Sequence, residues 1–128
     1  MSSSESARAT VVLIEDEDMM RSLVKLHLTN AGYEVLEAAD AVEGGHLVLE
    51  SSPALVICDV KLPYMDGYEF VAALKADPQT RHIPVVFLTM DEEVDTQAKA
   101  LGAEAYLRKP VRADRLLQVV SLFASPAA

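Results

Sequence analysis

Reactive side chains follow several apolar stretches of this 128-residue sequence, and Asp59 is the central one. Asp59 directly follows an uninterrupted apolar run, Ala54-Leu55-Val56-Ile57-Cys58. A short run of this kind between turn residues is typical of a strand that is buried on both faces of a parallel sheet. Ligands of open α/β sheets bind at the carboxyl ends of the strands. We therefore expect the carboxylate of Asp59 to lie at a functional edge of the sheet.

Four more side chains of suitable chemistry follow other apolar runs: Glu15, Asp16, Thr89 and Lys109. Three carboxylates close together would raise one another's pKa values unless a cation lay between them. Oxygen ligands of this kind suit Mg²⁺, or Mn²⁺. A carboxylate beside bound Mg²⁺ can attack phosphorus and form an aspartyl phosphate, while an ammonium and a hydroxyl group cover the phosphoryl oxygens. In this scheme Asp59 is the nucleophile.

Each of these residues also has an ordinary structural interpretation. Asp59 is a common turn residue, and the acids Glu15 and Asp16 would complement the dipole of a following helix. Thr89 could cap a helix, and Lys109 could be a solvated charge. All five residues at one edge of a sheet would be an unusual coincidence, so we prefer the joint chemical interpretation.

Strands and helices alternate along the sequence, and this order predicts how the reactive residues are brought together. Apolar runs predict strands over residues 10–14, 33–38, 54–58, 83–88 and 105–107, and apolar residues at helical spacing predict helices near residues 20–28, 41–51, 68–76, 94–101 and 113–123. Short right-handed crossovers then give a five-stranded parallel sheet with helices on both faces, a doubly wound (βα)5 α/β fold. All strand ends carrying the reactive residues would share one edge.

Composition limits the possible partners and organisation of the chain. A balance of 11 basic and 20 acidic residues, a net charge of −9, argues against nucleic acid or an anionic membrane as a direct partner. No apolar run is long enough to span a bilayer, and the polar start does not resemble a signal peptide. The single cysteine, Cys58, is expected to be buried in a reducing compartment, and the protein to be cytoplasmic. We expect a flexible segment at 1–9, one domain at 10–124 and a tail at 125–128.

From Thr10 to Phe123 the sequence resembles the receiver domain of two-component response regulators. The resemblance rests on Glu15-Asp16, on the segment Asp59-Val60-Lys61-Leu62-Pro63-Tyr64-Met65-Asp66-Gly67, on Thr89, and on Tyr106 followed by Lys109-Pro110. It implies a flavodoxin-like fold, and a phosphohistidine donor on a sensor histidine kinase or a histidine phosphotransfer protein. It also implies that the domain catalyses only its own phosphorylation and dephosphorylation.

The resemblance also implies a role for each matching residue. Asp59 resembles the phosphoacceptor. Glu15 and Asp16 resemble the Mg²⁺-binding acids, with the backbone carbonyl of Lys61 as a further ligand. The remaining matches resemble the phosphate-pairing lysine (Lys109), the switch hydroxyl (Thr89), the switch aromatic residue (Tyr106) and the proline of a cis peptide bond (Pro110).

Two positions depart from the usual pattern of the family. Glu15 stands where aspartate is commoner, and Met90 stands after Thr89 where a small residue is usual. Met90 could narrow access to the phosphoryl group. We also expect Lys61 and Asp91 to flank the path of the hydrolytic water, where an ion pair between them would slow dephosphorylation.

Two other classes of protein could use a similar sheet. A phosphatase of the haloacid-dehalogenase type also uses an aspartate nucleophile, but a second aspartate should then stand two residues later, where this sequence has Lys61. A flavin-binding module needs an anion-accepting loop after the first strand, and the acids at 15–18 would repel the flavin phosphate.

The output of the domain is not evident from the sequence, which suits either a stand-alone receiver that binds a partner or a piece of a longer chain. We expect a monomer before phosphorylation. Transcription factors of the family pair through the face formed by the fourth helix, the fifth strand and the fifth helix, using acids before the last strand and arginines in the last helix. Of those acids only Glu104 remains here, and the last helix has no base after Arg115.

Overall fold

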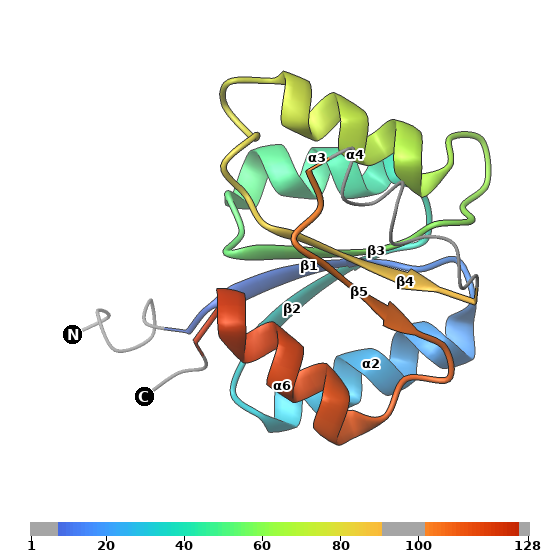
Figure 1. The fold of residues 1–128 in the computed structure, drawn as a ribbon, viewed down its shortest axis with the longest axis vertical. Helices are drawn as coiled ribbons and strands as arrows, with labels where there is room; N and C mark the ends of the chain where they lie inside the picture. The colour runs from blue at the N-terminus through green and yellow to red at the C-terminus, as the bar shows by residue number, and fades with distance from the viewer. Residues whose placement is uncertain (1–7, 91–101, 126–128) are drawn as a thin grey trace.

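A single parallel β-sheet forms the centre of the molecule (Figure 1). The computed structural model describes residues 8–90 and 102–125. All neighbouring strands are parallel, and their order in the sheet is β2-β1-β3-β4-β5. The strands are β1 (Thr10–Ile14), β2 (Glu34–Ala38), β3 (Leu55–Asp59), β4 (Val85–Thr89) and β5 (Ala105–Arg108). The predicted five-stranded parallel sheet is therefore confirmed.

Helices cover both faces of this sheet. Figure 1 shows α3 and α4 together on one face and α2 and α6 on the other. Their bounds are α2 (Asp18–Asn30), α3 (Ala41–Ser51), α4 (Gly67–Ala76) and α6 (Ala113–Phe123). The helix predicted at residues 94–101 lies outside the described residues, and so do residues 1–7 of the predicted segment 1–9 and residues 126–128 of the predicted tail 125–128. No described helix is long and apolar enough to cross a membrane.

The central strand β3 explains the two-sided core. All five of its residues are buried, and successive side chains point to opposite faces. Val56 and Cys58 belong to the hydrophobic cluster beneath α3 and α4. Leu55 and Ile57 belong to the cluster beneath α2 and α6. An apolar run without alternation is therefore the pattern of a strand that feeds two cores.

The helix patterns were predicted less accurately than the strands. Leu23 and Val42, two of the apolar residues in the helices predicted at 20–28 and 41–51, are 42% and 62% exposed. Val119 of α6 is buried. Apolar spacing overestimates the buried stripe of a helix because a neighbouring element covers only part of that face.

Candidate functional site

The register of the sheet places four reactive residues side by side at the carboxyl ends of the strands. Ile14 pairs with Cys58, so Glu15 and Asp59 are the next residues on neighbouring strands. Asp59 pairs with Leu88, so Thr89 follows one position later on β4. Thr89 in turn pairs with Arg108, the residue before Lys109. Parallel pairing therefore brings one carboxylate, hydroxyl or ammonium from each of four strands to the same edge.

Asp59 is held at the end of β3 with its carboxylate directed toward two donors. Its backbone and side chain together are only 6% exposed. The amide N–H of Lys61 donates to Oδ1 over 3.2 Å, and Nζ of Lys109 donates to Oδ2 over 2.9 Å. A carboxylate fixed by a backbone amide and an ammonium is oriented for reaction rather than free to rotate.

Glu15 is the most buried polar residue of the site, with a side chain that is fully inaccessible to solvent. Burial raises its pKa from 4.5 to about 7, the Asp59 carboxylate adds to this rise, and Lys109 and the Glu17 amide oppose it. Nζ of Lys109 lies 2.8 Å from Oε1 of Glu15, and the amide of Glu17 donates to Oε2 over 3.1 Å. Glu15 is thus a carboxylate whose ionised form needs more positive charge than Lys109 provides.

Lys109 lies between the two buried carboxylates. Burial alone would lower its pKa, but the carboxylates of Glu15 and Asp59 outweigh that effect and the net shift is upward. The ammonium group therefore stays charged at neutral pH. The backbone of Lys109 is fixed by a 2.8 Å hydrogen bond from its N–H to the carbonyl of Thr89, and the peptide bond from Lys109 to Pro110 is cis.

The residues present fit a divalent cation. One carboxylate oxygen from each of Glu15, Asp16 and Asp59 lies within 4.8 Å of the others. Oε1 of Glu15 is buried and, among the described residues, no donor meets it with hydrogen-bond geometry despite the nearby ammonium. An all-oxygen donor set with one exposed member, Asp16, is suited to Mg²⁺, which keeps several water ligands.

Other predicted site residues lie around this cluster. The side chain of Thr89 is buried at the end of β4. Tyr106 is half-buried on β5 and packs against the cluster beneath α3 and α4. Met90 is 80% exposed, and Lys61 is also exposed. Asp91 lies outside the described residues, so its pairing with Lys61 stays a prediction.

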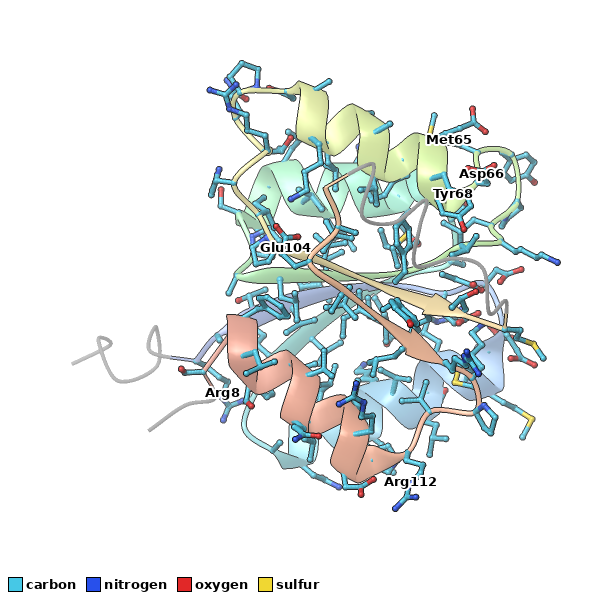
Figure 2. The ribbon with its side chains drawn as sticks, in the orientation of Figure 1. Arg8, Met65, Asp66, Tyr68, Glu104 and Arg112 are labelled. Carbon is cyan, nitrogen blue, oxygen red and sulfur yellow. The ribbon has the colours of Figure 1, made fainter. Side chains whose placement is uncertain are left out.

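The sequence argument gave no supporting role to two residues of the site, Arg21 and Gly67. Nη1 of Arg21 donates to the backbone carbonyl of Glu15 over 2.8 Å. A positive charge in the first turn of a helix is unfavourable for the helix dipole. The position of Arg21 could therefore have indicated that its side chain has a specific hydrogen-bond partner. A Cβ atom at Gly67 would lie 2.3 Å from the carbonyl oxygen of Asp59. Figure 2 shows Met65, Asp66 and Tyr68 around this start of α4.

The fold and the site are those expected of a receiver domain, and comparison with known proteins gives the same family. The family model described as "Response regulator receiver domain" matches residues 11–121. The chain therefore belongs to the response regulator receiver domain family, whose members are signalling proteins rather than conventional enzymes.

Individual relatives support this assignment. The polar-differentiation response regulator DivK of Brucella anthropi is 31% identical over 123 residues, covering 92% of this chain and 98% of DivK. The DNA-binding transcriptional regulator RpaA of Synechocystis sp. is 32% identical over 109 residues, and the match covers 84% of this chain but 45% of RpaA. The chain therefore spans less than half the length of RpaA and nearly all of DivK.

Solved structures give the same result. The chemotaxis response regulator CheY4 of Vibrio cholerae is 33% identical, with a TM-score of 0.85 over 91% of this chain and 98% of CheY4. A response regulator from Chloroflexus aurantiacus is 31% identical, with a TM-score of 0.87 over 91% of this chain and 97% of that structure.

Proposed function

We propose that Asp59 accepts a phosphoryl group from a phosphohistidine on a sensor histidine kinase or a histidine phosphotransfer protein, in a reaction that requires Mg²⁺ or Mn²⁺. One observation carries the proposal. The Asp59 carboxylate is fixed 2.9 Å from the Lys109 ammonium, and its oxygens cluster with those of Glu15 and Asp16. Such a cluster is costly for a structural core and useful for binding a cation and a phosphoryl group.

The chemistry is a transfer of one phosphoryl group. A carboxylate oxygen of Asp59 forms the new bond to phosphorus, and the phosphorus–nitrogen bond of the donor breaks. The imidazole nitrogen keeps the electron pair of that bond. Lys109 offsets negative charge on the phosphoryl oxygens, and the Thr89 hydroxyl donates to one of them. Glu15 and Asp16, with the Lys61 carbonyl, would hold the cation, which supplies charge neutralisation when bound.

Phosphorylation would then change a surface for a partner. In this proposal the Thr89 hydroxyl moves toward the phosphoryl group, and Tyr106 turns into the space that it leaves. Asp59 is thereby coupled to the surface formed by the helix predicted at residues 94–101, β5 and α6, a two-state element biased by a local change of charge. We propose that this surface contacts a downstream protein or an output domain, and that the protein acts in the cytoplasm without direct contact with nucleic acid or membrane.

We also propose a monomer before phosphorylation. Glu104 is already engaged within the chain. Nζ of Lys75 lies 3.2 Å from its Oε2, and the amide of Val85 donates to its Oε1 over 2.7 Å. A carboxylate held by these contacts is less available for pairing with a second copy.

The lifetime of the phosphoryl group would depend on the residues at the mouth of the site. Lys61 and Met90 are exposed there. We propose that Lys61 and Asp91 together restrict the approach of water, with Met90 crowding the same opening. Lys61→Ala and Asp91→Ala should then each speed dephosphorylation, and the double variant should gain less than the product of the two.

Labelling with a small-molecule donor tests the central step. Incubation with acetyl phosphate and Mg²⁺ should add one hydroxylamine-sensitive phosphate, and Asp59→Asn should abolish it. Glu50→Gln, at an exposed acid in α3, is the matched control and should label normally. Equal labelling of Asp59→Asn would contradict the proposal, as would sustained turnover of a generic phosphate ester, which is expected of a phosphatase.

A further inference from the structure

Two large apolar side chains are exposed on α3. Val42 is 62% exposed and Leu49 is 61% exposed. With His46, which is also exposed, they are spaced i, i+4 and i+7, a spacing that aligns three side chains along one side of a helix. Figure 1 shows α3 beside α4 on one face of the sheet. No side chain of the described residues covers Val42, His46 and Leu49, which we call the α3 face.

The surface beside the α3 face is low, because Gly45 has no side chain. A Cβ atom at Gly45 would lie 3.7 Å from Cε1 of Phe70, so Gly45 is on the side of α3 that is turned toward α4. Ala73 follows Phe70 by three residues, is therefore on the same side of α4, and is exposed. A second helix lying along α3 can approach closely here, since the distance between packed helices depends on the size of the side chains at the contact.

Acids without basic partners border the α3 face. Glu43 and Glu50 are exposed and seven residues apart, so both lie along the same side of the helix. The amide of Ala39 donates to Oε1 of Glu43 over 3.1 Å, but a neutral donor leaves the carboxylate negatively charged. Neither carboxylate forms an ion pair with a lysine or arginine of the described residues. Between Lys25 and Lys61 the chain has no lysine or arginine and six acids, which are Glu34, Glu37, Asp40, Glu43, Glu50 and Asp59.

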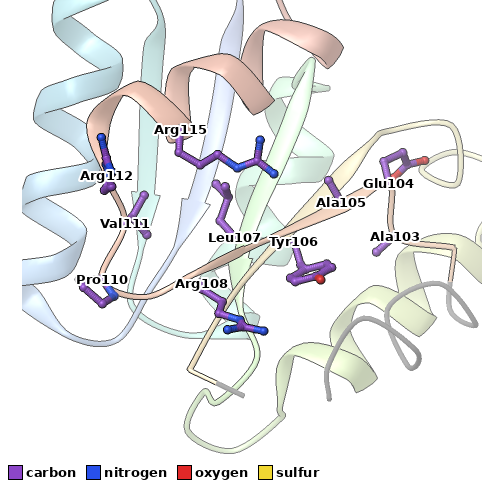
Figure 3. A pocket seen from close by; sticks show the side chains of 10 residues that line it. All are labelled: Ala103, Glu104, Ala105, Tyr106, Leu107, Arg108, Pro110, Val111, Arg112 and Arg115. Carbon is purple, nitrogen blue, oxygen red and sulfur yellow. The ribbon is translucent and has the colours of Figure 1, made fainter. Parts of the chain in front are cut away.

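The lysines and arginines within the described helices lie away from the α3 face. Arg21 and Lys25 are on α2, where both form ion pairs with an acid of β2. Arg115 is on α6, as Figure 3 shows. Figure 1 shows α2 and α6 on the other face of the sheet from α3. Lys75 of α4 is paired with Glu104 at 3.2 Å. The α3 face therefore combines exposed apolar side chains with negative charge that the chain itself does not neutralise.

We propose that the α3 face binds a basic amphipathic helix of a partner protein. The apolar side of that helix lies on Val42 and Leu49, and its lysines or arginines pair with Glu43 and Glu50, so that residues at helical spacing anchor it. The acids disfavour other occupants of an apolar helix face. A second copy would bring the same acids against one another, and nucleic acid or an anionic membrane would be repelled.

The inference goes beyond the proposed function and does not depend on it. α3 carries none of the residues proposed to hold the cation or the phosphoryl group, which lie at the carboxyl ends of β1, β3, β4 and β5. The α3 face is thus a second interaction surface, separate from the surface that Tyr106 is proposed to change.

The probe is a fluorescently labelled peptide of leucine and lysine, with the leucines spaced to form one apolar side of a helix. A scrambled peptide of the same composition keeps the charge without the apolar side. Binding is measured by fluorescence anisotropy. The double variant Val42→Ser/Leu49→Ser removes the apolar anchors, and Leu26→Ser/Leu122→Ser is its matched control, because these leucines are exposed on α2 and α6.

A second pair of variants tests the charge. Glu43→Gln/Glu50→Gln removes both acids and keeps a carbonyl oxygen that can accept from the amide of Ala39. Asp77→Asn/Asp114→Asn is the matched control, because it changes the net charge equally at exposed positions outside α3.

The patterned peptide should bind the wild-type protein, more weakly as the salt concentration rises, and the scrambled peptide should bind much less. Val42→Ser/Leu49→Ser should weaken binding roughly tenfold or more, because truncated anchors dominate the loss of affinity at an interface. Glu43→Gln/Glu50→Gln should weaken it about fivefold, and each control should change it less than about twofold. Amide signals of residues 41–51 should shift in NMR spectra of the wild-type protein with the peptide, which tests the site without any variant.

Several results would overturn the proposal. Equal binding of the scrambled peptide would show that net charge alone attracts it. Equal weakening in a variant and its matched control, or NMR shifts confined to residues outside α3, would place the peptide elsewhere. A dimer that Val42→Ser/Leu49→Ser abolishes would make a second copy the occupant. Labelling of Asp59 is measured in parallel: if labelling fails while peptide binding persists, the proposed function fails and the proposal for the α3 face stands.

Discussion

The guanidinium group of Arg21 is hydrogen-bonded to the backbone carbonyl of Glu15, with 2.8 Å between Nη1 and O. The same side chain reaches Glu37 through Nε at 3.2 Å and Asp18 through Nη2 at 2.6 Å. Arg21 therefore ties the loop after β1 to β2 and α2. Because Glu15 turns its carboxylate into the site from this loop, Arg21 is a positioning residue for the proposed cation.

Arg21→Ala should weaken Mg²⁺ binding by about tenfold, because residues that orient ligands affect affinity on that scale. Lys25→Ala is a matched control. It removes a 2.6 Å ion pair to the same Glu37 but leaves the hydrogen bond from Arg21 to Glu15 in place. Mg²⁺ titration followed by NMR gives both affinities. Similar losses in the two variants would show that Arg21 acts only through Glu37.

Glu15 should make the metal-free protein less stable as the pH rises. Its pKa is about 7 in the folded protein against 4.5 in the unfolded chain, chiefly because of burial. Between these values the folded state binds more protons than the unfolded state, so the free energy of unfolding falls with rising pH. Glu15→Gln should remove this dependence and raise the free energy of unfolding by about 3 kcal/mol at pH 8, with little change near pH 4.

Urea unfolding with a chelator present, at several pH values, measures this effect. Glu17→Gln is the control, because Glu17 is exposed in the same loop. A pH profile of Glu15→Gln that runs parallel to that of the wild type would contradict the prediction.

Much of the fold could be predicted from the sequence, because short apolar runs rich in β-branched residues are typical of buried strands. A parallel sheet with short crossovers fixes where each strand ends, so the clustering of Glu15, Asp59 and Lys109 could be predicted without coordinates. The supporting contacts could not. Arg21 meets Glu15 across a loop, and no spacing rule relates a side chain to a backbone carbonyl six residues earlier.

The pair Gly44-Gly45 is an instructive case. From helix propensity alone both glycines should weaken the helix at 41–51. The structure separates them. A Cβ atom at Gly44 would lie 2.4 Å from Cδ1 of the fully buried Ile14, whereas at Gly45 the nearest atom, on Phe70, is at 3.7 Å. Gly44 is therefore required by the packing of α3 against β1, and Gly45 is not.

Alanine substitutions at Gly44 and Gly45 should change the free energy of unfolding in opposite directions. Gly44→Ala should lower the free energy of unfolding by about 1–3 kcal/mol through overpacking, and Gly45→Ala should raise it by about 0.5–1 kcal/mol through helix propensity. Chemical denaturation of both variants measures the difference. Equal effects in the two variants would show that Ile14 relaxes freely around the added methyl group.

The last prediction concerns Tyr33, whose hydroxyl joins the beginning of β2 to the end of α6. The phenol is 2% exposed and donates to the carbonyl of Ala124 over 2.6 Å. Burial raises its pKa, so the donor stays protonated at neutral pH. Tyr33→Phe should lower the free energy of unfolding by about 1–2 kcal/mol, because the buried carbonyl loses its donor. Tyr64→Phe is the control: it removes a hydroxyl group from a residue that is 94% exposed, and it should change the free energy of unfolding little. Urea denaturation compares the two, and equal midpoints for Tyr33→Phe and wild type would mean that water replaces the hydroxyl at Ala124.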